Sequence, residues 1–128
     1  MKIYKMKDMM GGWFVGNFTP TAFNTADVEV CYKKHKQGEL WDVHFHKIAT
    51  EINFLVTGKM KIQDTILEKG DVFVISPYEV SDPVFLEDCE VVIVKIPSVT
   101  GDKYSYELHY RWSVYRYEYW ELYSLQAG

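Results

Sequence analysis

The sequence GELWDVHFHKIATEINFLVTG (residues 38–58) places three potential metal ligands within eight residues. They are His44, His46 and Glu51, in a run otherwise rich in apolar side chains. Side chains two residues apart on a strand point to the same face, so a strand over 39–46 brings the two imidazoles side by side. If the chain then turns and pairs antiparallel with itself, Glu51 returns to the same place.

Two imidazoles and one carboxylate form a ligand set that suits divalent Fe, Mn, Ni, Zn or Cu. Neutral imidazole and ionised carboxylate are the forms that bind a metal, and both are accessible at pH 7. Alternating histidines also fit an exposed strand face, or buried histidines satisfied by hydrogen bonds. These residues alone leave the metal site and the structural role both open.

Stretches of β-branched, aromatic or alternating residues follow one another on both sides of this segment. They are bounded by turn residues at close spacing, which is typical of an all-β sandwich or barrel. No convincing helix precedes residue 98, and residues 19–25 are interpreted as a loop. The predicted strands cover residues 12–18, 27–34, 39–46, 50–58, 71–76, 83–87 and 89–97, with a two-stranded hairpin over 59–70 that turns near Gln63 and Asp64.

Composition limits the class of protein. The 128 residues are 48% hydrophobic, enough for one domain with a real core. The formal net charge of −4 argues against a nucleic-acid partner, because phosphate contacts need clustered basic residues. The basic stretch CYKKHK (residues 31–36) is interpreted as a solvated strand end.

The two cysteines and the lengths of the apolar runs indicate the cellular compartment in which the protein is expected. Cys31 and Cys89 lie in separate apolar segments without a CxxC pattern, and we expect two free buried thiols. The first twelve residues lack the apolar core of a signal peptide, and no run approaches the length of a membrane span. We therefore expect a soluble, cytoplasmic protein.

The C-terminal segment, residues 104–128, differs from the rest. Residues 104–123 carry seven of the ten tyrosines and two of the four tryptophans. Strand alternation fits its first residues, but a helix is favoured because apolar residues recur at intervals of four and three, with Ser105 as a candidate cap. So much aromatic surface is expected to pack on the β domain (residues 1–103) or on a second subunit. The apolar residues with helical spacing are Leu108, Trp112, Tyr115, Tyr119 and Leu122.

The spacing of the glycines and ligands resembles the first motif of the cupin superfamily. Gly38, His44, His46, Glu51 and Gly58 match its five fixed positions, and Gly70 with GDVFVISP begins the second motif at the right distance. The core motifs span residues 38–58 and 70–83. The resemblance implies an RmlC-like, double-stranded β-helix or jelly-roll barrel, with tight turns at the glycines. It also implies a homodimer, with His44, His46 and Glu51 pointing into the barrel as metal ligands.

The second motif departs from the family pattern. Counting from Gly70, the position of the family's third ligand histidine holds Ser81. Asp82 could replace the histidine only if the strand register slips by one residue, because adjacent residues face opposite ways. Glu79 lies in the probable turn and is a poorer substitute.

The resemblance implies two kinds of function. One is an enzyme that uses a divalent metal, either an isomerase or epimerase or a dioxygenase, on a small polar molecule such as a sugar derivative or an organic acid. Glu51, Tyr78 and Asp82 are its candidate catalytic residues, and Asn53, Tyr78, Ser81 and Asp82 its candidate substrate-pocket residues, with Glu79 at the mouth. The alternative is a barrel that binds a sugar or carboxylate without chemistry. No nucleic acid and no membrane partner is expected for either.

Overall fold

The computed structural model of the chain describes residues 1–106 and 124–125. These residues form short strands and a single turn of 3-10 helix, η1 (Met6–Asp8), which confirms the all-β class. In this part of the chain no helix is long and apolar enough to cross a membrane. The strands are β1 (Trp13–Gly16), β2 (Phe23–Asn24), β3 (Glu29–His35), β4 (His44–Phe45), β5 (Thr50–Thr57), β6 (Lys59–Ile62), β7 (Thr65–Glu68), β8 (Val72–Ile75), β9 (Val84–Phe85), β10 (Cys89–Ile96), β11 (Lys103–Ser105) and β12 (Ser124–Leu125).

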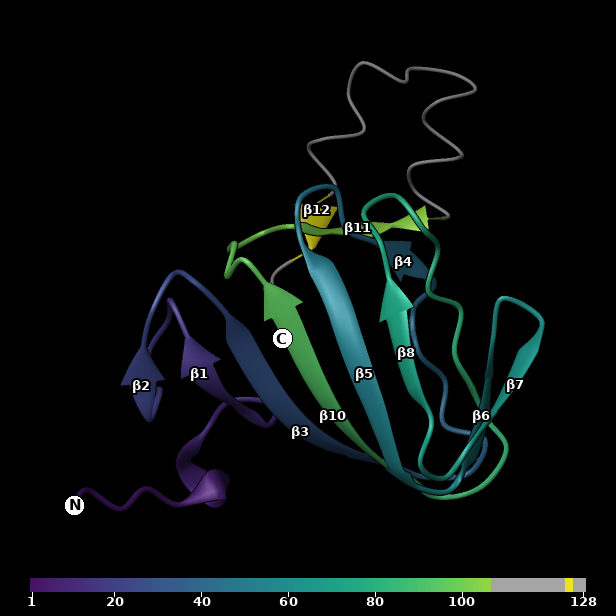
Figure 1. Ribbon diagram of the computed structural model, residues 1–128, viewed down its shortest axis with the longest axis horizontal. Coiled ribbons are helices and arrows are strands. Elements are labelled where there is room, and N and C mark those ends of the chain that lie inside the picture. The colour runs from purple at the N-terminus through teal and green to yellow at the C-terminus, as the bar shows by residue number, and fades with distance from the viewer. Residues whose placement is uncertain (107–123, 126–128) are drawn as a thin grey trace.

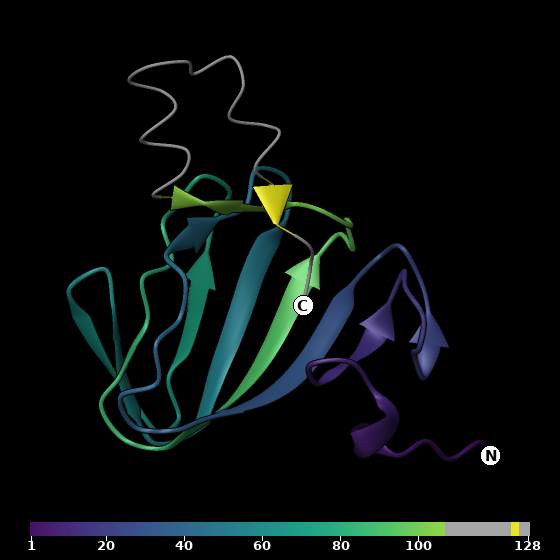
Figure 2. The same cartoon turned by 180° about the vertical axis from the view of Figure 1, so that it is seen from behind.

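One large sheet and two small ones build the domain. The large sheet has the order β2-β1-β3-β10-β5-β8, and the small sheets have the orders β12-β11-β4 and β7-β6-β9. Figures 1 and 2 show β4, β11 and β12 lying across one end of the large sheet, with the β6–β7 hairpin at the side away from the N-terminus. The turn from β4 to β5 therefore lies at the end where β11 crosses.

The inward faces of the long central strands change from polar to apolar along their length. On β5 the buried residues are Glu51, Asn53 and Leu55. The neighbouring strand β10 runs antiparallel, with Lys95 opposite Glu51 and Val91 opposite Leu55. The two strands thus place polar side chains at one end of the barrel and apolar ones at the other. The apolar end is the core, formed by Leu55, Met60, Ile62, Ile75, Phe85, Cys89 and Val91.

The three glycines expected at turns all adopt positive φ. The angles are +76° at Gly38, +95° at Gly58 and +93° at Gly70. Gly58 is also constrained by space, because a Cβ there would lie 2.3 Å from the carbonyl oxygen of Asp88 and 2.7 Å from Cys89 Sγ. Only glycine fits such a position without moving the neighbouring backbone.

Two predicted elements differ in the structure. The strand expected over 39–46 is reduced to His44–Phe45, because among the described residues only these two find ladder partners, on β11. The predicted loop 19–25 contains the short strand β2, which pairs in parallel with β1. The hairpin over 59–70 is confirmed as β6 and β7, joined through Gln63 and Asp64, whose φ angles of 50° and 59° suit a tight hairpin turn.

The start of the aromatic C-terminal segment belongs to the β structure. Strand β11 crosses the predicted boundary at residue 103 and pairs with β4, and the Tyr104 ring stacks 5.5 Å from that of Phe45. Ser105, the expected helix cap, is the last residue of this strand, and Tyr106 directly after it is helical. The predicted helix itself falls on residues 107–123, which lie outside the described residues.

Both cysteines are buried and free, as predicted. Burial raises the pKa of the Cys31 thiol to about 12, and it also raises the pKa of Cys89. The two thiols therefore behave as small apolar groups of the interior.

Candidate metal centre

The structure brings the three predicted metal ligands together. His44 and His46 come from β4 and the residue that follows it, and Glu51 comes from the start of β5. One potential ligand atom from each lies within 4.8 Å of the others, and the three side chains are between 4% and 8% exposed. The imidazole rings lie 5.3 Å apart, so the two histidines project into the same space as strand alternation predicts.

Backbone carbonyls fix the tautomer of both histidines. His44 Nδ1 lies 2.9 Å from the carbonyl oxygen of Asp42, and His46 Nδ1 contacts the carbonyl oxygen of Asp102. A carbonyl oxygen can only accept, so each Nδ1 carries a proton and donates it. In a neutral imidazole this leaves Nε2 as a bare lone pair. Metal-ligating histidines are commonly held in this way through their second nitrogen.

The second nitrogen of His46 has no conventional partner. Its Nε2 is buried and accepts or donates no hydrogen bond among the described residues, although Glu51 Oε1 lies 3.3 Å away. A lone pair and a carboxylate at this separation repel each other unless a proton or a cation lies between them. A metal ion bound by both atoms removes that repulsion, so these residues fit a metal ion.

The protonation states suit the same role. Burial lowers the pKa of His44 to about 4, so its imidazole is neutral at pH 7. Burial alone would raise the pKa of Glu51, but in the metal-free protein a proton between His46 Nε2 and Glu51, together with His44 and Asn53, outweighs it and lowers the pKa to about 2. Asn53 Nδ2 donates to Glu51 Oε2 at 3.1 Å and so orients the carboxylate. A neutral imidazole and an ionised carboxylate are the forms a metal requires.

Asp102 supports the ligands although it touches no predicted metal position. Its carboxylate accepts the backbone N–H groups of Lys47, Ile48 and Ala49 at distances from 2.8 to 3.2 Å, and its carbonyl accepts from His46. The side chain is 2% exposed. One residue therefore holds both the turn from β4 to β5 and one ligand ring. Our sequence reasoning missed it, because nothing local links positions so far apart.

Ser81, at the family's third-histidine position, faces the cavity. It is 5% exposed, and its backbone N–H and carbonyl both bond to those of His44, at 2.7 and 3.0 Å. Its neighbour Asp82 turns away, and its carboxylate accepts the backbone N–H of Gln63 at 2.7 Å. The register therefore does not slip, and Asp82 does not replace the missing histidine.

The other residues expected at the mouth also lie outside the cavity lining. Tyr78 is 66% exposed, and its ring stacks at 6.1 Å on Phe45 from outside. The Glu79 carboxylate accepts the backbone N–H of Ser76 within its own turn. Of the predicted substrate-pocket residues, Asn53 and Ser81 line the cavity, and Tyr78 and Asp82 do not.

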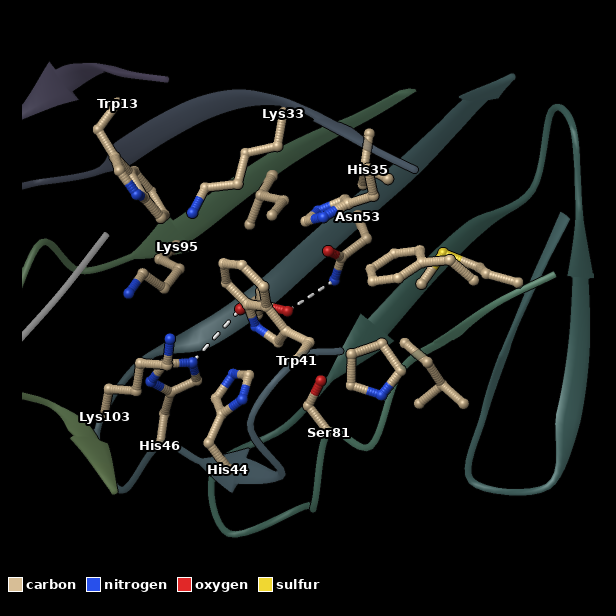
Figure 3. Close-up of a pocket in the computed structure, with 17 residues that line it drawn as sticks. Trp13, Lys33, His35, Trp41, His44, His46, Asn53, Ser81, Lys95 and Lys103 are labelled. Atoms are coloured by element: carbon tan, nitrogen blue, oxygen red, sulfur yellow. Dashed lines mark hydrogen bonds and ion pairs between the residues drawn. The ribbon is translucent and has the colours of Figure 1, made fainter. Parts of the chain in front are cut away.

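The cavity beside the ligands has a volume of about 60 Å³ and is drawn in Figure 3. Much of its lining was not predicted. In particular, Lys33 and His35 of the CYKKHK stretch point inward, while Lys34 and Lys36 are exposed, so the interpretation of a solvated strand end is wrong for alternate residues. The lining comprises Trp13, Lys33, His35, Trp41, His44, His46, Glu51, Asn53, Met60, Ile62, Ser81, Pro83, Phe85, Val91, Ile93, Lys95 and Lys103.

A second histidine–carboxylate pair lies at the same cavity. His35 Nδ1 lies 2.5 Å from Glu39 Oε2, and the His35 ring stacks at 4.1 Å on Phe85. The Trp41 ring meets His35 edge to face at 5.2 Å. These contacts fix the orientation of the imidazole in the cavity wall. A strand over 39–46 would place Trp41 on the face opposite His44 and His46, but Trp41 lies in a loop, where strand alternation does not apply.

Solved structures with the same architecture identify the fold. No family model and no curated protein matches the sequence. The structure of KdgF from Halomonas sp. aligns with 59% of this chain and 73% of its own, at a TM-score of 0.53 and 25% identity. An RmlC-like cupin protein from Ralstonia eutropha aligns with 57% of this chain and 50% of its own, at 0.51 and 18%. The chain has a cupin fold.

A double-stranded β-helix protein from Klebsiella pneumoniae supports the same assignment. It aligns with 58% of this chain and 66% of its own length, at a TM-score of 0.54 and 21% identity. Identities this low establish the cupin architecture and leave the activity to be argued from the site. Within that architecture, the cluster of His44, His46 and Glu51 could hold a metal ion.

Proposed function

We propose that the chain is a metal-binding cupin that acts on a small polar molecule at the cavity beside His44, His46 and Glu51. The observation that carries this is the pair of histidines whose Nδ1 atoms are held by carbonyls, with the unpartnered Nε2 of His46 facing Glu51. Fe, Mn, Ni and Zn all suit the donor set. A metal bound there would supply a Lewis acid or support oxygen chemistry.

The chain's own residues supply binding and proton transfer in this proposal. Asn53 keeps the Glu51 carboxylate turned toward His46, and Asp102 keeps the His46 ring in place. His35 reaches the same cavity with its Nδ1 held by Glu39, which orients the imidazole to accept or donate a proton there. The reaction types that fit are isomerisation or epimerisation, which need proton transfer, and dioxygenation, which needs the metal.

A binding protein without chemistry is the second candidate. The observation that favours it is Ser81, whose hydroxyl stands where the family pattern has a third histidine. Three ligands leave more positions for water or ligand than four do, and they hold a metal less tightly. This candidate predicts a ligand that binds to the cavity and is released unchanged.

The metal content of the purified protein tests the metal site. Protein purified without added metal should contain close to one Fe, Mn, Ni or Zn per chain by elemental mass spectrometry. His46→Ala should lose it, while the exposed Lys34→Met control should keep it. A wild-type protein that carries no metal and takes up none on dialysis would refute the metal site.

Turnover separates the two candidates. The metal-loaded protein is incubated in D2O with a panel of small hydroxy acids, keto acids and sugar derivatives, and NMR follows deuterium uptake while an electrode follows oxygen. Isomerase or epimerase activity predicts deuterium incorporation that falls in His35→Gln, and dioxygenase activity predicts oxygen uptake that stops in His46→Ala. Saturable binding with neither signal supports the binding protein.

A further inference from the structure

Three lysines from three different strands converge on the cavity. They are Lys33 of β3, Lys95 of β10 and Lys103 of β11. The Nζ atoms of Lys33 and Lys103 lie 4.7 and 5.0 Å from the centre of the Trp41 ring, and Lys95 Nζ lies 4.8 Å from that of Trp13. Figure 3 shows the three ammonium groups on the side of the cavity where His46 lies.

Bringing these charges together opposes folding. Burial lowers the pKa of both Lys33 and Lys103, and for Lys103 the neighbouring Lys33 and Lys95 lower it further. Lys95 is only 3% exposed. The tryptophan rings offset part of the burial of each charge, yet they leave the charge itself in place. The cavity thus holds three ammonium groups close together in its wall.

Carboxylates act on the lysines mostly from outside the cavity: Glu39 acts on Lys33, and Asp42 acts on Lys103. Lys95 lies in register between Glu29 on β3 and Glu51 on β5, so its charge has neighbours of opposite sign. Among the described residues that line the cavity, Glu51 is the one carboxylate against three lysines, and it already contacts His46. No ion pair within 4.0 Å is found for Lys103 in the described part of the chain. An anion bound in the cavity would contact the three ammonium groups from the side where the lining offers them few carboxylate oxygens.

We propose that the cavity binds the carboxylate of a small organic acid, held by Lys33, Lys95 and Lys103. The placement of the rest of the acid beside His46 and Glu51 rests on the proposed function, but binding of the carboxylate does not need a metal. A volume of about 60 Å³ has room for roughly four to six waters, so it admits a small acid or one end of a larger one.

A carboxylate suits this site better than a phosphate. Lysine binds phosphate as a point charge, but phosphate sites in proteins commonly add arginine forks or the backbone N–H groups of a helix N-terminus. Neither is found among the described residues that line the cavity. A flat carboxylate, by contrast, can lie against the tryptophan rings while each lysine donates to one of its oxygens.

Calorimetric titration of metal-free protein with malonate tests the proposal. Metal is first removed with a chelator and dialysis, because malonate itself binds metals. Wild-type protein should bind malonate saturably, and Lys103→Met should weaken it at least about tenfold through loss of a charge-assisted contact. Lys34→Met, an exposed lysine beside Lys33, is the matched control and should bind as the wild type does. Malonamide, the neutral analogue, should not bind.

Stability measurements distinguish a binding role from a structural one. If the lysines serve an anion, ligand-free Lys103→Met should melt at the same temperature as the wild type or higher, because a buried repulsion is removed. If that variant misfolds, Lys33→Met provides the same comparison. Malonate binding that is equal in wild type and lysine variants, or malonamide binding as tight as malonate, would overturn the proposal.

Two further outcomes separate this inference from the metal site. Lysine-dependent malonate binding by a protein that takes up no metal supports the inference while the proposed metal function fails. Normal metal uptake with no lysine-dependent binding of malonate supports the metal site and overturns the inference of a carboxylate site. Inorganic phosphate that binds more tightly than malonate, with the same dependence on Lys103, would overturn the assignment to a carboxylate.

Discussion

Replacing Asp102 with alanine tests whether one buried carboxylate holds the turn that carries the metal ligands. The change leaves the N–H groups of Lys47, Ile48 and Ala49 without their acceptor. A hydrogen bond to a charged group contributes about 1.5–3 kcal/mol. Ile48 is exposed and can turn to water, whereas Ala49 is 2% exposed and cannot. We therefore expect a loss of about 3–4 kcal/mol in the free energy of unfolding, measured by urea denaturation of metal-free protein.

The same substitution should also weaken metal binding, although it removes no ligand. His46 donates to the Asp102 carbonyl, so a displaced turn misplaces the ring, and loss of such support typically costs about 10–100-fold in metal affinity. Metal affinity is measured by competition with a coloured chelator. Asp102→Asn, which keeps one acceptor oxygen, should fall between alanine and wild type in both measurements.

Asp27→Ala is the control, because Asp27 is exposed and should change stability by less than about 0.5 kcal/mol. A loss below about 1 kcal/mol in Asp102→Ala would refute the anchoring role. A large loss of stability with unchanged metal affinity would refute the positioning of His46 and leave a purely structural residue.

Three other predictions follow from the geometry. The metal-free protein should lose stability as the pH falls from about 6.5 to about 4, because His44 is protonated over this range in the unfolded chain but stays neutral in the folded one. Each pKa unit is worth about 1.4 kcal/mol, so the loss in the free energy of unfolding approaches about 3 kcal/mol. His44→Gln should flatten this part of the pH profile measured by urea denaturation, and an unchanged profile would refute the reasoning. Below about pH 4.5 the lowered pKa of Glu51 adds a further loss, because its carboxylate then begins to be protonated in the unfolded chain first. Gly58→Ala should lower the free energy of unfolding by about 2–4 kcal/mol, since a Cβ would strike the Asp88 carbonyl. Gly38→Ala, with a similar φ but open space around it, should lower it by about 1 kcal/mol. Equal losses in the two variants would show that φ alone matters. We also propose a homodimer whose interface includes the C-terminal segment, so light scattering should give twice the 15.1 kDa chain mass, and deletion of residues 107–128 should halve it. A monomeric wild type contradicts the homodimer, and a deletion variant that stays dimeric shows that this segment is not the interface.

The metal ligands could be predicted because their geometry is local. His44 and His46 are two residues apart, and Glu51 follows after one turn, so strand alternation and a single reversal determine where they meet. The glycines at positions 38, 58 and 70 fixed the turns on either side, and all three have the backbone conformation that this requires. Asp102 could not be found in this way, because it reaches the turn from a strand connection more than fifty residues later.

The lysines escaped prediction for a different reason. In a strand with one buried face, the apolar residues are expected inside, and on β3 this assigns Val30 and Tyr32 to the core. The structure does the opposite, with Glu29 and Cys31 almost completely buried. A strand that crosses a binding cavity must place polar groups inward over part of its length, so the apolar pattern no longer identifies the inner face.

The neighbouring strand carries the information that the pattern on β3 lacks. On β5 the buried face consists of Glu51, Asn53 and Leu55. Two polar residues are therefore followed on the same face by a residue of the apolar core. Because β10 pairs with both β3 and β5, the inward position of Glu51 fixes that of Lys95, and Lys95 in turn fixes that of Glu29. Ladder parity then places Lys33 on the inner face, four residue pairs further along. Strand pairing, once known, thus predicts the cationic side of the cavity from the position of one metal ligand.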